Sequence, residues 1–202
     1  MENFYKNNGI NYNINNPYFL YTTLSIDHSL QQQMIATVES QIETGDYNGG
    51  YTFVVEESDQ EFSILYNTFK HICNTVFENL DISIYNRTIC WANVYNKNTY
   101  RSNLHHHLRT SSINSVFYLQ VPIDKMENSC GLRVITKDHL DQVFIPEELD
   151  LVIMPSWMPH EPLPHSSQSN RIAINMEIAC NQKIDDFYTL NKIYKNCKIN
   201  VE

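Results

Sequence analysis

The hydrophobic period of the chain changes to two after Asp81, and this change limits the fold more than any other feature. Six short stretches beyond that point are rich in Ile, Val, Phe and Tyr, and Pro, Asn, Asp or Gly separates them. This pattern is typical of short β-strands. The stretches are TICWANVY (88–95), SINSVFYLQV (112–121), GLRVIT (131–136), DQVFIP (141–146), DLVIMP (150–155) and RIAINMEI (171–178).

Two segments before this region show the three- and four-residue spacing of amphipathic helices. The first spans residues 29–44 behind a start at Asp27 or Ser29, and the second spans 58–80 with Ser58 as a cap. The predicted buried stripes are Leu30, Met34, Val38 and Ile42 in the first segment, and Phe62, Leu65, Phe69, Ile72, Val76, Phe77 and Leu80 in the second.

Two helices followed by six or more strands predict an α+β, mainly β protein, in which a barrel or jelly roll is backed by the helices. No linker divides the 202 residues, so we expect a single domain over 1–202. Within it we expect a flexible Asn-rich arm at 1–16, supporting helices in 27–80 and a β core at 82–180. The tail from residue 183 predicts a last helix through Phe187, Leu190 and Ile193.

Composition excludes several classes of function. The formal net charge is -9 and no Lys/Arg cluster occurs, so we expect no nucleic-acid partner. No run of 18 apolar residues occurs, and the Asn-rich start lacks the apolar stretch of a signal peptide, so we expect no secretion and no membrane partner. The five cysteines are odd in number and lack a C-x-x-C pair, which suits reduced thiols and a cytoplasmic location.

The stretch 171–178 has an informative alternation. Ile172, Ile174, Met176 and Ile178 share one face of the predicted strand, and the other face carries Arg171, Ala173, Asn175 and Glu177. In an ordinary sandwich the second face would be in solvent. In a small barrel with a polar interior, Arg171 would point into a pocket.

Histidines are concentrated in SNLHHHLRTSSIN (102–114), and a further one, His160, lies in PSWMPHEPLPH just after a predicted strand. If both strands line one barrel mouth, an H-x-H pair and His160 would meet. Imidazole ligands suit Fe, Zn, Ni or Cu, and two or three of them leave positions open for exogenous ligands. Arg171 follows His160 by 11 residues, which allows a turn and re-entry on the next strand. A guanidinium there could pair with a carboxylate of a metal-bound dicarboxylate.

The segments SVFYLQVP, GLRVITKD, DLVIMPSWMPH and NRIAINMEI resemble, in this order and spacing, the small 2-oxoglutarate/Fe(II)-dependent oxygenases of bacteria and marine phages. The resemblance covers about residues 91–178, and PSWMPH…R is its most specific part. It implies a double-stranded β-helix, an iron ligand at His160, and an Arg171 that holds the far carboxylate of 2-oxoglutarate. It also suggests His105 and His107 as the H-x-H pair.

The activity implied is hydroxylation coupled to oxidative decarboxylation of 2-oxoglutarate, with Fe(II), O2 and, as a candidate further requirement, ascorbate. The location would be the cytoplasm, or the host cytoplasm if the protein is phage-encoded. The substrate stays open among small molecules, peptides and proteins, and the Asn-rich arm could support a homo-oligomer. Alternatives are a cupin-like metal-binding protein without O2 chemistry and a non-catalytic barrel module.

The chain departs from the family pattern in three places. No Asp or Glu lies within two residues of the histidine run, although a carboxylate is the commonest third ligand. The family register would place the pair on His106 and Leu108, so His105 and His107 require a one-residue insertion. The alternative is a two-histidine site through His106. Leu149 stands where the family often has Gly before the DLVIMP strand.

Further pocket residues follow from strand alternation. Trp91, Asn93 and Tyr95 share one face of their strand, and Asn114, Val116, Tyr118 and Gln120 share one face of the next. If these faces line the pocket, Tyr118 and Asn93 would hydrogen-bond 2-oxoglutarate and Trp91 would form a wall. Asn175 lies on the same face as Arg171 and could reach the pocket as well.

Overall fold

The computed structural model describes residues 11–13, 20–42, 51–55, 59–76, 89–96, 104–107, 112–122, 130–136 and 141–179. These residues form two α-helices and ten β-strands, so this part of the chain is mainly β, as predicted. The helices are α2 (His28–Ile42) and α3 (Gln60–Val76). The strands are β1 (Asn11–Asn13), β2 (Leu20–Thr23), β3 (Tyr51–Val54), β4 (Ile89–Tyr95), β5 (Ile113–Gln120), β6 (Leu132–Ile135), β7 (Asp141–Phe144), β8 (Asp150–Pro155), β9 (His160–Pro162) and β10 (Arg171–Ile178).

Both predicted helices are confirmed, and an aspartate stands at the start of each. Asp27 accepts a hydrogen bond from the backbone N–H of Ser29 through Oδ1, at 2.8 Å, which satisfies one of the unpaired donors at a helix start. Before α3, the carbonyl of Asp59 accepts the N–H of Ser63 at 3.1 Å. The predicted cap Ser58 lies outside the described residues, as do residues 43–44 and 77–80 of the predicted helical segments.

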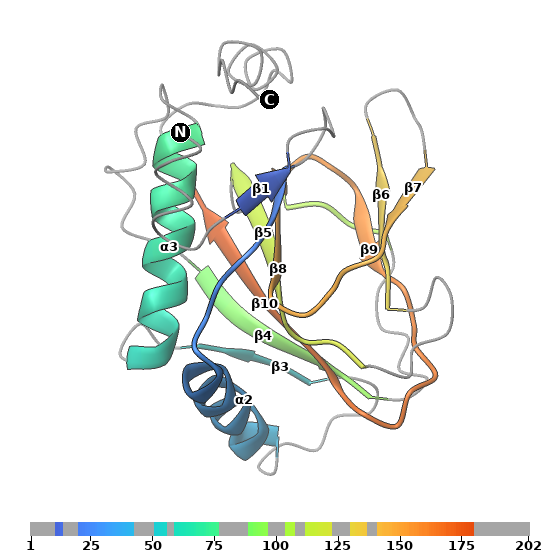
Figure 1. The fold of residues 1–202 in the computed structure, drawn as a ribbon. Coiled ribbons are helices and arrows are strands. Elements are labelled where there is room, and N and C mark those ends of the chain that lie inside the picture. The colour runs from blue at the N-terminus through green and yellow to red at the C-terminus, as the bar shows by residue number, and fades with distance from the viewer. Residues whose placement is uncertain are drawn as a thin grey trace.

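The strands form two antiparallel sheets. The large sheet has the order β1-β2-β8-β5-β10-β4-β3, and the small sheet has the order β7-β6-β9. All six stretches with strand periodicity are strands: β4, β5, β6, β7, β8 and β10. In Figure 1, α2 and α3 lie on one side of the large sheet, and the small sheet lies on the other.

Four strands were not predicted, namely β1, β2, β3 and β9. Each has three or four residues, and pairing with a neighbouring strand defines it. β1 falls within the arm that was expected to be flexible, and it pairs with β2 from Asn11↔Thr23 to Asn13↔Tyr21. Backbone hydrogen bonding to an existing sheet edge needs no apolar pattern, so an Asn-rich segment can still form a strand. The tail beyond residue 179, with its predicted helix, lies outside the described residues.

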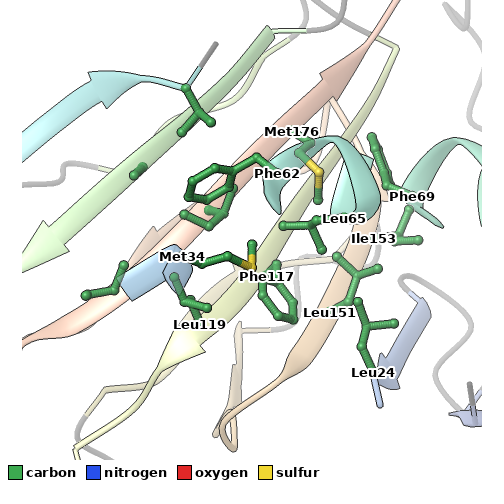
Figure 2. Packing of buried hydrophobic residues seen from close by; sticks show 14 of the residues in the cluster. Leu24, Met34, Phe62, Leu65, Phe69, Phe117, Leu119, Leu151, Ile153 and Met176 are labelled. Atoms are coloured by element: carbon green, nitrogen blue, oxygen red, sulfur yellow. The ribbon is translucent and has the colours of Figure 1, made fainter. Parts of the chain in front are cut away.

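The larger hydrophobic core lies between the helices and the large sheet. Figure 2 shows Phe62, Leu65 and Phe69 of α3 packed with side chains that come from α2 and the sheet, Met34 and Phe117 among them. Phe69 and Phe117 are 0% exposed. Burying a side chain of this size contributes about 1.5–3 kcal/mol, so this layer fixes the helices on the sheet.

A second core lies on the opposite face of the large sheet, toward the small sheet. Val116 and Tyr118 of β5, Val152 of β8 and Ala173 of β10 contribute to it from the large sheet, together with Leu132 and Val134 of β6. The central strands are therefore buried on both faces, and every residue of β10 is buried. The face of β10 that carries Arg171 is enclosed between the sheets.

The backbone at Leu149 has a φ of 70°, in the left-handed region that favours glycine. Two hydrogen bonds hold this turn before β8: the Leu149 N–H donates to the Tyr118 carbonyl at 2.7 Å, and the Leu24 N–H donates to the Leu149 carbonyl at 2.9 Å. The conformation explains why glycine suits the position, and the departure affects only a turn. Neither α2 nor α3 is long and apolar enough to cross a membrane, and no other helix occurs in the described residues.

Candidate metal centre

Residues 104–107 are held against β9 and the end of β8 by backbone hydrogen bonds. His105 and His160 form an isolated β-bridge: the His105 N–H donates to the His160 carbonyl at 3.1 Å, and the His160 N–H donates to the His105 carbonyl at 2.9 Å. The His107 N–H donates to the carbonyl of Ser156 at 2.7 Å. Two segments far apart in the sequence are thereby fixed side by side.

This bridge brings together the three imidazole rings that were predicted as ligands. The ring centroids of His105 and His160 are 4.6 Å apart, those of His105 and His107 5.0 Å, and those of His107 and His160 5.2 Å. One ligand atom from each of the three lies within 4.8 Å of the others. The exposed His106 is not part of this cluster, so the geometry assembles the three-histidine set.

His160 is oriented by its backbone surroundings. Its Nδ1 lies 2.9 Å from the carbonyl oxygen of Met158, an acceptor, so Nδ1 carries the proton and the lone pair is on Nε2. Burial lowers the pKa of His160 to about 3, and the side chain is therefore neutral at physiological pH. A neutral imidazole with a fixed tautomer is the form that binds a metal ion.

Two polar side chains beside the histidines were not predicted as site residues. Glu177 of β10, 3% exposed, contacts Nδ1 of His107 through Oε1. Asn114 of β5 places its Nδ2 3.3 Å from Nε2 of His160. Strand alternation had placed Glu177 on the face of Arg171 and Asn114 on the face of Tyr118, so the signal for their position was present. Their partners could not be inferred without the fold.

A single pocket collects the predicted site residues. It is lined by the three histidines and by residues of β4, β5 and β10, and the small sheet contributes Leu132 and Pro162. All seven residues predicted to bind metal or co-substrate line it: His105, His107, His160, Arg171, Tyr118, Asn93 and Asn175. Trp91, predicted as a wall, also lines the pocket, and its ring centroid is 5.9 Å from that of His107.

Arg171 is a buried cation at this pocket, and no carboxylate in the described part of the chain forms an ion pair with it. The residue is 1% exposed. Its Nη1 donates to the carbonyl of Leu163 at 3.0 Å, and its guanidinium lies 4.4 Å from the ring centroid of Tyr95. Among the described residues its buried Nε has no hydrogen-bond partner, and neither has the buried Nδ2 of Asn175. Burying a charge or a donor without a partner is costly, so these groups fit an anionic ligand that would complete them.

Tyr118 offers a hydroxyl group that could donate to an anionic ligand in this pocket. Burial raises the pKa of Tyr118 well above its ordinary value, while the charge of Arg171 acts in the opposite direction. The phenol therefore stays protonated at physiological pH and can donate a hydrogen bond to a carboxylate oxygen.

The donor set fits a transition metal ion that prefers nitrogen ligands. Ligand atoms of three imidazoles converge, and three protein ligands leave positions open for exogenous ligands. The second nitrogen of His160 is held by a carbonyl and that of His107 by a carboxylate, the usual means of orienting metal-binding histidines. A metal ion beside the guanidinium of Arg171 and the amide of Asn175 could bind a small ligand with two anionic ends, one at the metal and one at these donors.

No family model matches the chain, and no curated protein matches it. Solved structures do. A prolyl-4-hydroxylase from Pseudomonas putida is 14% identical with a TM-score of 0.62, over 88% of this chain and 96% of that chain. A prolyl hydroxylase from Trichoplax adhaerens, in complex with a peptide fragment of the hypoxia inducible factor oxygen degradation domain, is 14% identical with a TM-score of 0.63, over 91% and 90%.

A third similar structure is an oxidoreductase of the 2OG-Fe(II) oxygenase family from Burkholderia pseudomallei. It is 11% identical with a TM-score of 0.51, over 79% of this chain and 84% of that chain. Sequence identities this low carry the fold alone. The protein therefore has the fold of prolyl hydroxylases and of an oxidoreductase of the 2OG-Fe(II) oxygenase family.

Proposed function

We propose that the protein is a 2-oxoglutarate- and Fe(II)-dependent oxygenase that hydroxylates its substrate. One observation carries this proposal: a buried arginine without a carboxylate partner among the described residues lines the same pocket as a convergent set of three histidines. A cupin-like metal protein without 2-oxoglutarate would use the histidines but would have no use for the buried Arg171.

In this proposal His105, His107 and His160 hold Fe(II), and Arg171 binds the far carboxylate of 2-oxoglutarate. When bound, Fe(II) with 2-oxoglutarate and O2 supplies the oxidant for a C–H bond, as 2-oxoglutarate becomes succinate and CO2. Nε and Nη2 of Arg171 provide donors for one carboxylate, while Nη1 donates to the Leu163 carbonyl. Nδ2 of Asn175 and the protonated hydroxyl of Tyr118 add neutral donors, and Asn93 lines the same wall.

We also infer that the two sheets are the halves of a double-stranded β-helix, the jelly-roll fold that the family resemblance implies. The small sheet faces the enclosed side of the large sheet, and a hydrophobic core fills the space between them. The pocket is lined from both sheets, by β9 on one side and by β4, β5 and β10 on the other. This arrangement supports a barrel with the site at its mouth.

The substrate is proposed only as a class. Two of the similar structures are named prolyl hydroxylases, and one of them is in complex with a peptide. Prolyl residues in peptides are therefore the first substrates to test, followed by free amino acids and small metabolites. We propose no nucleic-acid or membrane partner.

The test is succinate formation from 2-oxoglutarate by the Fe(II) protein with O2 and ascorbate, together with 2-oxoglutarate binding under anaerobic conditions. We expect Arg171→Met to abolish saturable 2-oxoglutarate binding while Fe(II) binding persists. Arg133→Met is the matched control, because Arg133 pairs with Asp141 and Glu161 away from the pocket. His105→Ala and His107→Ala should each remove Fe(II) binding, whereas His106→Ala should not. A wild-type Fe(II) protein that does not bind 2-oxoglutarate would refute the proposal.

A further inference from the structure

Glu177 is the one carboxylate that the described structure places directly against a histidine of the trio. It lies near the end of β10, where it pairs in register with Asn114 of β5 and Ile89 of β4, so the backbone on both sides is fixed. Its side chain is 4% exposed, and that of His107 is 15% exposed. A carboxylate this deeply buried normally has a specific partner, and here the partner is Nδ1 of His107.

We propose that Glu177 is a positioning residue of the metal centre: it accepts the Nδ1–H of His107 and thereby presents Nε2 of that ring to the metal. This inference rests on the proposed metal site, and it extends that site to a residue that does not touch the metal. A neutral imidazole has one N–H and one lone pair, so a carboxylate at Nδ1 decides which nitrogen is the ligand.

The position of Glu177 makes a direct ligand role unnecessary. The trio whose ligand atoms converge consists of histidines, and Glu177 is not a member of it. Its Oε1 instead contacts Nδ1, which leaves Nε2 of His107 for the metal. A carboxylate in this outer position orients the ring and makes the imidazole a stronger ligand.

The same contact addresses the missing carboxylate of the sequence motif. Three neutral imidazoles bring no negative charge to a divalent ion, whereas the commonest facial triad includes one carboxylate. Glu177 places a carboxylate one hydrogen bond further out, through His107. One face of β10 then carries two charged side chains that serve the pocket. Arg171, at the start of the strand, faces the anionic ligand, and Glu177, near its end, orients His107.

The test is metal binding by the full chain, with Co(II) alone as an air-stable probe whose visible absorption reports ligand geometry. The variants are Glu177→Gln, which keeps the shape and an acceptor oxygen but not the charge, and Glu177→Ala, which loses both. The matched control is Asp150→Asn, another buried carboxylate, whose partners are the Thr23 hydroxyl and the backbone N–H of Glu147. Urea unfolding of the metal-free proteins measures stability separately.

We expect stoichiometric Co(II) binding in every protein, weakened about 10- to 100-fold in Glu177→Ala and by a smaller factor in Glu177→Gln. The Co(II) spectrum should shift in both Glu177 variants and remain that of the wild type in Asp150→Asn. An affinity and spectrum of Glu177→Gln and Glu177→Ala equal to those of Asp150→Asn would overturn the inference.

The outcomes separate this inference from the proposed function. If the wild type binds Co(II) and the Glu177 variants behave as expected, but the Fe(II) protein binds no 2-oxoglutarate, the positioning role stands and the oxygenase proposal falls. If the wild type binds 2-oxoglutarate and metal, and Glu177→Ala binds metal with unchanged affinity, the oxygenase proposal stands and the positioning role falls. A wild type that binds no metal overturns both.

Discussion

Burial changes the protonation and the solvation of a titratable side chain, and the two buried groups His160 and Arg171 differ in how they respond. His160 is 4% exposed, and burial keeps it neutral, whereas Arg171 stays charged at 1% exposure. The histidine lone pair and the guanidinium charge are therefore both available to ligands. Burial of each of these groups also carries a free-energy cost, because water no longer solvates it.

The cost at His160 predicts a pH dependence of stability. Its folded pKa of about 3 lies below the ordinary value of 6.5, so between these values the unfolded chain binds more protons than the folded one. The stability that neutral His160 contributes is therefore fully present above about pH 6.5 and is lost as the pH falls toward 3. The free energy of unfolding falls by at most about 1.4 kcal/mol per pH unit from this group.

Urea unfolding of the metal-free protein at about pH 7, 6 and 5 tests this dependence. The free energy of unfolding should fall more steeply with acidification in the wild type than in His160→Gln. His28→Gln, at an exposed histidine of α2, is the control and should retain the wild-type slope. Parallel slopes for the wild type and His160→Gln would contradict the prediction.

Helix α3 buries one side and exposes the other. Phe69 is 0% exposed and belongs to the core under the large sheet, whereas Ile64 on the same helix is 51% exposed. Phe69→Ala should therefore lower the free energy of unfolding by about 3–5 kcal/mol through lost burial and a residual cavity. Ile64→Ala should change it by less than about 0.5 kcal/mol. Chemical denaturation of both variants decides, and equal losses would mean that the α3 interface is not as described.

The elements that could be predicted were those whose own residues repeat. Phe62, Leu65 and Phe69 mark α3 by helical spacing, and the alternation of 171–178 marks both β10 and its polar face. β9 could not be predicted, because its residues His160–Pro162 are too few to alternate and the partner β6 defines them. The contact between Glu177 and His107 was hidden for a similar reason. Alternation predicts the strand face on which Glu177 lies, but it does not predict that residues 104–107 pack against that face.

At the scale of the whole molecule, the pocket joins parts of the chain that are otherwise separate. β9 belongs to the small sheet and supplies His160, and β10 belongs to the large sheet and supplies Arg171 and Asn175. Residues 104–107 bridge to β9 through backbone hydrogen bonds and to β10 through His107 and Glu177. A ligand that binds only the folded pocket stabilises the fold by mass action, by about 2.7 kcal/mol at a concentration 100 times Kd.

That stabilisation should be unevenly distributed over the molecule. A bound metal opposes any local opening that separates β9 from residues 104–107. Helix α3 packs on the opposite face of the large sheet (Figure 1), so we expect it to open independently of the pocket. Amide hydrogen exchange with and without Co(II) should therefore slow most in β9 and in residues 104–107, less in β10, and least in α3. His160→Ala should remove the difference. A uniform slowing that includes α3 would mean that these segments open only when the whole protein unfolds, and slowing confined to α3 would place the metal elsewhere.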